Sequence, residues 1–396
     1  MRSNPAARIT AGAVALTLLV SSAASAQIDT RFPTELGDSL VGAVVTSAYD
    51  DRATNDLILK TAADYHREMG GRLRTAPDPN AKPKKGEKEQ PPGGWLSFPS
   101  VADAETLDQT VQDVVRNFRA NYTIVSGGDG QANVSIADGA TDGAAIIDLA
   151  QPAPCVTETG DADQSGVCAG DINAIPFNYT AIEFAVEDAA YLAGVVAAKA
   201  SRGGRLGVVS GYPGCLECQR YVEGFSAGAR AVDPDIDVVV GYLADDEASA
   251  FADSASARTY TEIFLDVYQP SVFMPVGRAV TDSMIEAACQ AESEVLVVGT
   301  GSDIRSVRPD LECVMLSVTR DLPRAIEEAL FQFSKGESQR VMTYDWANGG
   351  VGITDDWRER VAGLPVDTNE IYAAAEEAIR SGSVEACPRG CGESAG

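Results

Sequence analysis

The sequence predicts an α/β fold in which two parallel sheets, each flanked by helices, form two lobes. The chain has 396 residues, which is more than a single domain of about 100–200 residues usually holds. Apolar runs of strand length alternate with amphipathic stretches, and this alternation is typical of βαβ units. The runs are continuously apolar, as expected of parallel strands that helices cover on both faces.

About ten strands are expected, which is many for one sheet in a domain of this size. The strand-like runs are residues 40–46, 122–126, 144–149, 180–185, 206–210, 236–242, 271–275, 295–299, 314–318 and 340–344. Helical patterns lie between them at residues 55–69, 104–119, 186–199, 218–231, 255–268, 281–291 and 322–334. This order of elements predicts parallel sheets joined by helical crossovers.

Two segments interrupt this alternation. Residues 75–94 are rich in Pro, Gly and Lys and lack apolar periodicity, so they are expected to form a flexible surface insertion. Residues 152–174 are rich in Gly and Asp, contain Cys155 and Cys168, and are interpreted as a disulfide-bonded excursion between the lobes. Their acidic residues do not have the spacing of an EF-hand calcium loop.

The N-terminus has the three parts of a secretory signal peptide. Arg2 and Arg8 precede an apolar run at 11–20, and the small residues at 24–26 follow it. The apolar run is shorter than the roughly 20 residues that a transmembrane helix needs, although an uncleaved anchor is the alternative. Cleavage after Ala26 removes two arginines and no acidic residue, so the net charge changes from -27 to -29. The sequence therefore predicts a periplasmic or other extracytoplasmic protein.

The charge balance excludes several classes of partner and chemistry. The chain has 58 acidic and 31 basic residues, which argues against binding to nucleic acid or to an anionic membrane surface. Its single histidine, His66, argues against Ser/His/Asp, Cys/His and multi-histidine zinc chemistry. No metal and no cofactor is expected.

Eight cysteines follow the predicted signal peptide, and an even number in an exported chain indicates disulfides. The expected pairs are sequential neighbours: Cys155/Cys168, Cys215/Cys218, Cys289/Cys313 and Cys387/Cys391. The alternative for Cys215 and Cys218 is a redox-active CxxC motif, but Pro213 and Gly214 place them in a loop without a thioredoxin-like context.

Three stretches resemble the basic membrane protein, or PnrA-like, family of ABC transporter substrate-binding proteins for nucleosides. They are YLAG at 191–194, YVEGFSAG at 221–228 with PDI at 234–236, and VVGTGSD at 297–303. The resemblance covers residues 40–385 and is clearest after Thr180. It implies a type I periplasmic-binding fold, with two Rossmann-like lobes, three crossovers and a ligand cleft between the lobes. On that basis residues 40–175 and 303–338 are assigned to lobe 1, residues 176–300 and 340–386 to lobe 2, and residues 387–396 to a tail.

Polar residues and glycines follow most of the expected strands. Because ligands of open parallel sheets lie beyond the carboxyl ends of the strands, these residues are candidates for a binding site. The candidate ligand-binding residues are Asp50, Asp51, Asn55, Asp129, Tyr212, Arg278, Asp303 and Arg320. Taken singly, an Asp or Ser at such a position is at least as often a helix cap or a turn residue.

The resemblance also identifies departures at the expected ligand site. Thr54 stands where the family has a Phe that stacks on the nucleobase, and Gly301 stands where it has an Asp that holds the ribose. Arg320 replaces a family lysine. These departures argue against an unchanged purine-nucleoside site. We hypothesise that Arg278 and Arg320 clamp a carboxylate or phosphate of the ligand.

The sequence as a whole predicts a non-enzymatic, exported solute-binding protein, monomeric, that closes on a small polar ligand and delivers it to an ABC permease in the membrane. One alternative is an extracytoplasmic sensor subunit with the same fold. A less favoured alternative is a redox protein that uses Cys215 and Cys218.

Overall fold

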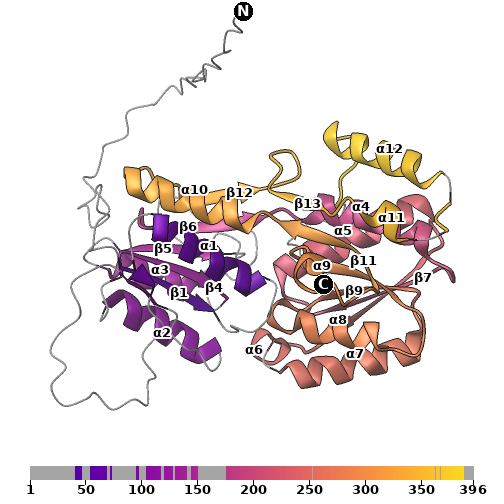
Figure 1. Ribbon diagram of the computed structural model, residues 1–396, viewed down its shortest axis with the longest axis horizontal. Coiled ribbons are helices and arrows are strands. Elements are labelled where there is room, and N and C mark those ends of the chain that lie inside the picture. Colours follow the sequence, from indigo (N-terminus) through magenta and orange to yellow (C-terminus); the bar gives the residue numbers. More distant parts are fainter. Residues whose placement is uncertain are drawn as a thin grey trace, which may run out of the picture.

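The chain folds into two lobes that lie side by side along the long axis of the computed structural model (Figure 1). The structure describes residues 41–46, 54–68, 72–73, 95–97, 104–116, 120–127, 130–140, 144–149, 175–251, 253–361, 363–365 and 367–387. The segments 75–94 and 152–174 and the predicted signal peptide lie outside these residues.

The first lobe is built on a seven-stranded sheet with the order β12-β6-β5-β4-β1-β3-β2. All its strand pairs are parallel. The strands are β1 (Val41–Thr46), β2 (Arg72–Leu73), β3 (Trp95–Ser97), β4 (Tyr122–Ser126), β5 (Ala145–Leu149), β6 (Tyr179–Phe184) and β12 (Val341–Tyr344). Helices α1 (Thr54–Glu68) and α10 (Leu322–Lys335) lie on one face, and α2 (Ala104–Arg116) and α3 (Gly130–Asp138) lie on the other.

The second lobe is built on a six-stranded sheet with the order β13-β11-β10-β9-β7-β8. Its strands are β7 (Arg205–Ser210), β8 (Asp237–Tyr242), β9 (Val272–Val276), β10 (Leu296–Gly301), β11 (Val314–Arg320) and β13 (Val351–Ile353). Only β13 runs antiparallel to its neighbour. All ten strands expected from the sequence are present, at bounds that differ by at most two residues.

Helices cover both faces of the second sheet as well. One face carries α4 (Glu187–Ala200) and α5 (Leu216–Val232), and the other carries α7 (Ser254–Tyr268) and α8 (Thr281–Cys289). The remaining helices of this lobe are α6 (Glu247–Ala250), α9 (Ile304–Val307), α11 (Trp357–Arg360) and α12 (Thr368–Arg380). A single apolar core runs from α1 and α10 in the first lobe to α4 and α5 in the second.

The chain crosses between the lobes three times. It leaves the first sheet after β6, returns after β11 into α10, which packs on α1, and leaves again between β12 and β13. In Figure 1 the late elements α10 and β12 accordingly lie among the early strands of the first lobe. Three crossovers are the number that the family resemblance implied.

The lobe boundaries expected from the sequence are wrong at three strands. β6 and β12, assigned to lobe 2, belong to the first sheet, and β11, assigned to lobe 1, belongs to the second. The Gly- and Asp-rich segment before β6 was interpreted as the link between lobes. However, β6 pairs in register with β5, from Ile146↔Tyr179 to Leu149↔Ile182, so the chain is still in the first lobe there. Loop composition does not determine which sheet the next strand joins.

Helices α4 and α5 approach each other so closely that their backbones touch. A Cβ atom added at Gly194 would overlap the carbonyl oxygen of Phe225, and one added at Gly228 would overlap that of Tyr191. Glycine is required at these positions because any side chain would force the two helices apart.

The carboxyl group of Asp148 is fully buried in the first lobe, between β5 and α3. Its Oδ2 accepts hydrogen bonds from Asn133 Nδ2 at 2.9 Å and from the Tyr179 hydroxyl at 2.8 Å. Desolvation raises the pKa of Asp148 to about 7, against the lowering effect of these two hydrogen bonds and of Arg278; the charge of Asp108 raises it further.

We therefore expect Asp148 to make stability fall by about 2–3 kcal/mol between about pH 5 and 8. Between pH 3.8, the ordinary pKa of the carboxyl group, and about pH 7, the Asp148 carboxyl of the folded protein binds a proton that it does not bind in the unfolded chain. The stability due to that proton is complete below the lower value and is lost as the pH rises through the higher one. Urea unfolding of the wild-type protein and Asp148→Asn across this range measures the effect. If the free energy of unfolding changed equally with pH in the wild-type protein and Asp148→Asn, the prediction would be wrong.

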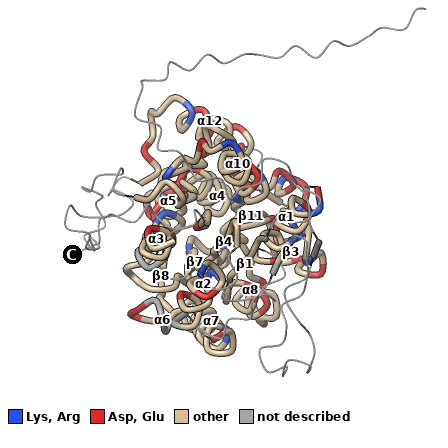
Figure 2. The backbone as a smooth tube through the Cα atoms, turned by 90° about the vertical axis from the view of Figure 1, so that its left-hand side faces the viewer, with Lys and Arg blue, Asp and Glu red and all other residues tan. Residues whose placement is uncertain are grey.

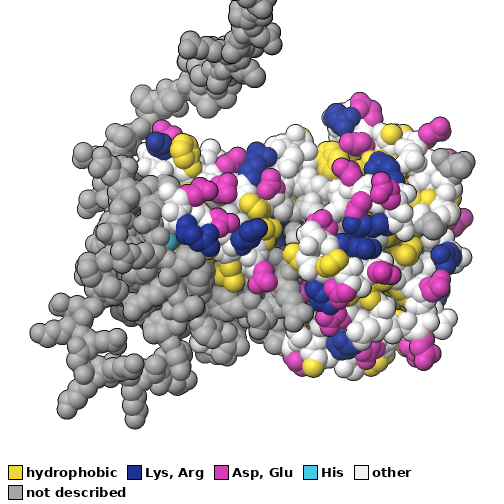
Figure 3. Space-filling view, viewed as in Figure 1, with side chains coloured by type: hydrophobic (Ala, Val, Ile, Leu, Met, Phe, Trp, Pro, Cys, Tyr) yellow, Lys and Arg dark blue, Asp and Glu magenta, His cyan; other side chains and the backbone are white. Residues whose placement is uncertain are grey.

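Acidic and basic residues are distributed along the described backbone, mostly on its outer elements (Figure 2). In the view of Figure 3, acidic and basic side chains are interspersed on the described surface and do not gather into patches of one sign. Within the described residues, no helix is both long and apolar enough to cross a membrane.

Candidate functional site

The carboxyl ends of the strands of the two sheets meet at the boundary between the lobes. Arg320 is the last residue of β11, and its guanidinium lies 5.5 Å from the ring centroid of Phe184, the last residue of β6. Arg278, which follows β9 in the second lobe, acts electrostatically on Asp148 in β5 of the first. In parallel sheets this edge is where ligands bind.

Two arginines and one glutamate form a cluster at this edge, here called the Arg–Glu–Arg cluster (Arg278, Glu217 and Arg320). Arg320 Nη1 donates to Glu217 Oε1 at 2.6 Å, and Arg278 Nε lies 3.5 Å from Glu217 Oε2. The side chains of Arg320 and Glu217 are 9% and 11% exposed, and that of Arg278 is 24% exposed. The carboxylate therefore bridges two guanidinium groups in a largely desolvated position.

Arg278 takes an unusual backbone conformation to reach this position. Its φ is 47°, in the left-handed region that residues other than glycine rarely adopt. The residue opens the single 3₁₀ turn between β9 and α8, and its guanidinium lies 4.8 Å from the ring centroid of Phe251. Strained backbone of this kind is typical of functional sites.

Glu217 is positioned by the start of α5. Cys215 is the N-cap residue of this helix, its Sγ accepts from the backbone N–H of Cys218 at 3.2 Å, and the two cysteines form a disulfide. Glu217 lies inside this four-residue ring, in the first turn of the helix. Both cysteines are only 1% exposed, so the disulfide lacks the access that the redox alternative requires.

Aromatic side chains flank the cluster on both sides. Tyr212 and Phe251 pack edge to face with ring centroids 6.2 Å apart, and Phe184 stacks on Tyr344 at 5.5 Å. Burial raises the pKa of Tyr221 on α5 to about 12, while the charge of Arg320 lowers it and that of Glu217 raises it. The Tyr221 phenol is therefore neutral at physiological pH.

Several buried polar atoms at the same strand ends lack a hydrogen-bond partner among the described residues. They are the hydroxyl oxygens of Thr46 at the end of β1, Ser210 at the end of β7 and Ser302 after β10, together with Nε of Arg320. Buried polar atoms are usually paired with protein, water or ligand. Among the described residues, three hydroxyls and one guanidinium N–H at these strand ends thus have unused hydrogen-bonding capacity.

The structure brings some of the predicted ligand-binding residues together and separates others. Arg278 and Arg320 share Glu217, and Tyr212 joins them through Phe251. Asp303 is the N-cap of α9 and accepts a hydrogen bond from the backbone N–H of Ser306. Helix capping was the alternative to ligand binding for a single Asp at such a position. Asn55 is buried in the first turn of α1. The predicted residues Asp50, Asp51 and Asp129 lie outside the described residues.

Sequence reasoning missed Glu217, Phe184 and Phe251. Glu217 lies between Cys215 and Cys218, and the interpretation of this segment considered only the two cysteines. Phe251 follows the short helix α6, which the sequence did not predict. A charged residue in the first turn of a helix that follows a strand is the signal that could have identified Glu217.

Two of the four expected disulfides, Cys215–Cys218 and Cys289–Cys313, are confirmed. Cys387 is also disulfide-bonded. Its expected partner Cys391 lies outside the described residues, as do Cys155 and Cys168.

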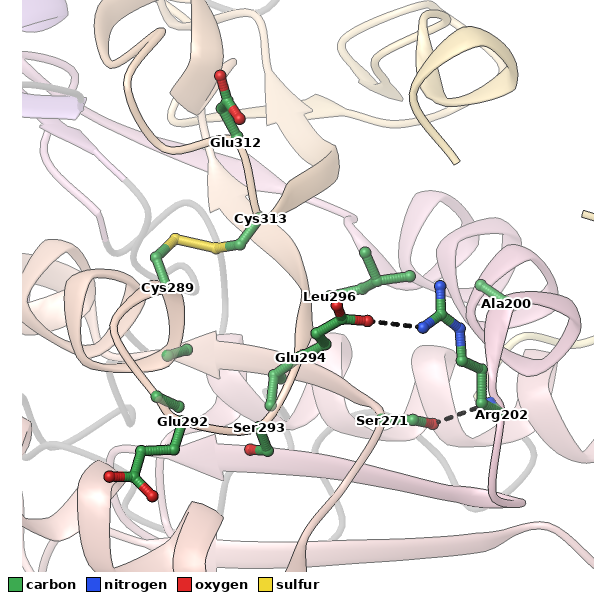
Figure 4. Close-up of a pocket in the computed structure, with 13 residues that line it drawn as sticks. Ala200, Arg202, Ser271, Cys289, Glu292, Ser293, Glu294, Leu296, Glu312 and Cys313 are labelled. Carbon is green, nitrogen blue, oxygen red and sulfur yellow. Dashed lines mark hydrogen bonds and ion pairs between the residues drawn. A yellow bond between two sulfur atoms is a disulfide. The ribbon is translucent and has the colours of Figure 1, made fainter. Parts of the chain in front are cut away.

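A cavity of about 440 Å³ lies at the opposite edge of the second sheet (Figure 4). The Cys289–Cys313 disulfide and the ion pair of Arg202 with Glu294 line it. This cavity adjoins the amino ends of β9 and β10, and the side chains of Arg202 and Glu294 are 70% and 89% exposed, so its polar groups are solvated. Among the described residues, no group of His, Cys, Asp and Glu is arranged to hold a metal ion.

Two α/β lobes, three crossings and polar strand ends that meet between the lobes define a two-lobed binding protein of the type I periplasmic class. Solved structures of this class share the fold. A solute-binding protein of an ABC transporter from Aeropyrum pernix matches with a TM-score of 0.64 and 14% identity, over 89% of this chain and 94% of its own. The Caulobacter myo-inositol binding protein matches with a TM-score of 0.53 and 13% identity, over 81% and 95%.

The chain belongs to the PnrA-like family of ABC transporter substrate-binding proteins, whose family model matches residues 164–377. The nucleoside-binding protein BmpA of an ABC transporter from Lactococcus lactis is 27% identical over 215 residues, 51% of this chain and 57% of its own length. Basic membrane protein A from Borreliella burgdorferi is 28% identical over 186 residues, 45% and 51%. The chain thus spans about half the length of the curated relatives it matches.

Proposed function

We propose that this protein is an exported solute-binding protein that closes its two lobes on a small polar solute and presents it to an ABC permease. It acts as a monomer and catalyses no reaction. The solute is nucleoside-like or another hydroxyl-bearing metabolite, and Tyr212, Arg278 and Arg320 contribute to its site. Membership of a substrate-binding family supports the proposal, as does the name of the Lactococcus relative, which mentions nucleosides.

The observation that carries the proposal is the set of polar groups at the carboxyl ends of strands from both sheets. Among the described residues, hydroxyls without a hydrogen-bond partner lie at the end of β1 in one lobe, and at the end of β7 and just after β10 in the other. The Arg–Glu–Arg cluster includes the last residue of β11. Three chain crossings at this edge provide the hinge about which such lobes close.

Thermal unfolding of the full chain with nucleosides, bases, sugars, amino acids and organic acids tests the proposal. A bound solute at 100 times its Kd adds about 2.7 kcal/mol of stability, which raises Tm by a few degrees. Small-angle X-ray scattering of the same samples should show a smaller radius of gyration with the stabilising solute. A protein that no member of the panel stabilises, and whose radius no member changes, would contradict the proposal.

A further inference from the structure

We propose that Glu217 is a specificity-determining residue. Its own carboxylate occupies the arginine pair, and it thereby selects uncharged solutes over their anionic analogues. This inference rests on the proposed function and concerns the same site. It reverses the hypothesis, made from the sequence, that Arg278 and Arg320 clamp an anionic group of the ligand.

Glu217 uses both of its carboxylate oxygens on the arginine pair. Oε1 accepts from Arg320 at 2.6 Å and Oε2 lies 3.5 Å from Arg278 Nε. The shorter contact is a charge-assisted hydrogen bond between two side chains that are about one-tenth exposed. A ligand carboxylate could bind Arg320 Nη1 only by replacing this contact.

The carboxylate is also held in place by the backbone that carries it. The Cys215–Cys218 disulfide closes the first turn of α5 around Glu217, and both sulfurs are buried. The disulfide therefore restrains the backbone of the turn that carries the carboxylate. An anion that enters the site is attracted by the two guanidinium groups and repelled by Glu217, so Glu217 lowers its affinity relative to a site with two unopposed arginines, and partial desolvation strengthens this effect.

The groups that lack a hydrogen-bond partner among the described residues at these strand ends are suited to an uncharged polar molecule. Ser210, Ser302 and Thr46 each offer a hydroxyl that both donates and accepts, and Arg320 Nε offers one N–H. Hydroxyl-bearing solutes satisfy such groups without adding a charge. Two guanidiniums and one carboxylate leave a single net positive charge in the cluster, compared with two if Glu217 were absent.

The test compares matched neutral and anionic solutes by calorimetry and thermal shift on the full chain: adenosine with adenosine 5′-monophosphate, uridine with orotidine, and glucose with glucuronate. In the wild-type protein we expect the neutral member to bind more tightly in each pair that binds. Tighter binding of the acids would overturn the inference and leave the proposed function intact. If no member of any pair bound to any variant, the inference would be overturned, and the wider solute panel described above would decide on the proposed function.

The variant Glu217→Gln removes the charge but keeps the shape, and it should shift the ratio of acid to neutral affinity at least tenfold toward the acid. The matched control is Glu286→Gln. Glu286 likewise lies between two arginines, Arg308 at 2.9 Å and Arg258 at 3.6 Å, but on α8 away from the cluster. In Glu286→Gln the ratio of acid to neutral affinity should stay within twofold of the wild-type ratio. A folded Glu217→Gln protein with an unchanged ratio would overturn the inference.

A second variant keeps the test decisive if Glu217→Gln does not fold. Glu217→Asp retains the negative charge and should retain the preference for neutral solutes, with a weaker contact to Arg320 because its side chain is one methylene shorter. A preference for acids in this variant would count against the inference, since the charge would still be present.

Discussion

Replacing Arg320 with alanine is expected to lower the free energy of unfolding by about 3–5 kcal/mol and to abolish solute binding. The Glu217 carboxylate would then be left in a largely desolvated site with Arg278 alone, whose nearest contact is 3.5 Å. Removing one partner of a buried ion pair is costly because the other charge stays buried without compensation. The cation–π contact with Phe184, which joins the two lobes, would be lost as well.

Urea unfolding measures this loss, and Arg202→Ala is the control. Arg202 also binds a glutamate, Glu294, at 2.8 Å, but in a solvated position at the other edge of the same sheet. An exposed pair of this kind contributes about 0–1 kcal/mol. Equal losses for Arg320→Ala and Arg202→Ala would show that the Arg–Glu–Arg cluster is not held as the structure describes.

The fold could be predicted from the sequence because helices cover these strands on both faces. Such strands are continuously apolar, so each of the ten is visible in the sequence without reference to its neighbours. Several of the missed elements lack a comparable signal. β2 and β3 have only two and three residues, and α3 (GQANVSIAD) has little apolar periodicity.

The assignment of strands to lobes could not be predicted in the same way, since it depends on pairing between distant residues. β12 joins the first sheet through its register with β6, from Val341↔Ala181 to Tyr344↔Phe184, about 160 residues earlier in the chain. No local pattern in either strand specifies that partner.

The site was predictable where its residues lie at or just beyond strand ends, as Arg320 and Arg278 do. Glu217 and Phe251 reach it from helical segments, through tertiary packing that periodicity does not reveal. The sequence therefore identified the two cations of the cluster and missed the anion that joins them. That omission is what led to the hypothesis of a clamp for an anionic ligand.

Replacing Gly228 with alanine is expected to destabilise the second lobe by more than about 4 kcal/mol, which is large for a single substitution. The added methyl group would overlap the carbonyl oxygen of Tyr191 in α4. Overpacking usually costs about 1–3 kcal/mol when side chains can move aside. Here the obstacle is helix backbone, so α4 and α5 would have to separate along a contact that also includes Gly194 and Gly224.

Thermal and urea unfolding of Gly228→Ala test this, with Gly203→Ala as the control. A Cβ atom at Gly203 meets no atom within 4 Å, so that variant should change stability by less than about 1 kcal/mol. Gly194, Gly224 and Gly228 lie in the two motifs, YLAG and YVEGFSAG, that carry the family resemblance. If Gly228→Ala is as stable as Gly203→Ala, the glycines of these motifs must be explained by something other than the contact between α4 and α5. If Gly228→Ala unfolds, the glycines of the two motifs are explained by the close packing of α5 on α4. That packing places Glu217 between the two arginines.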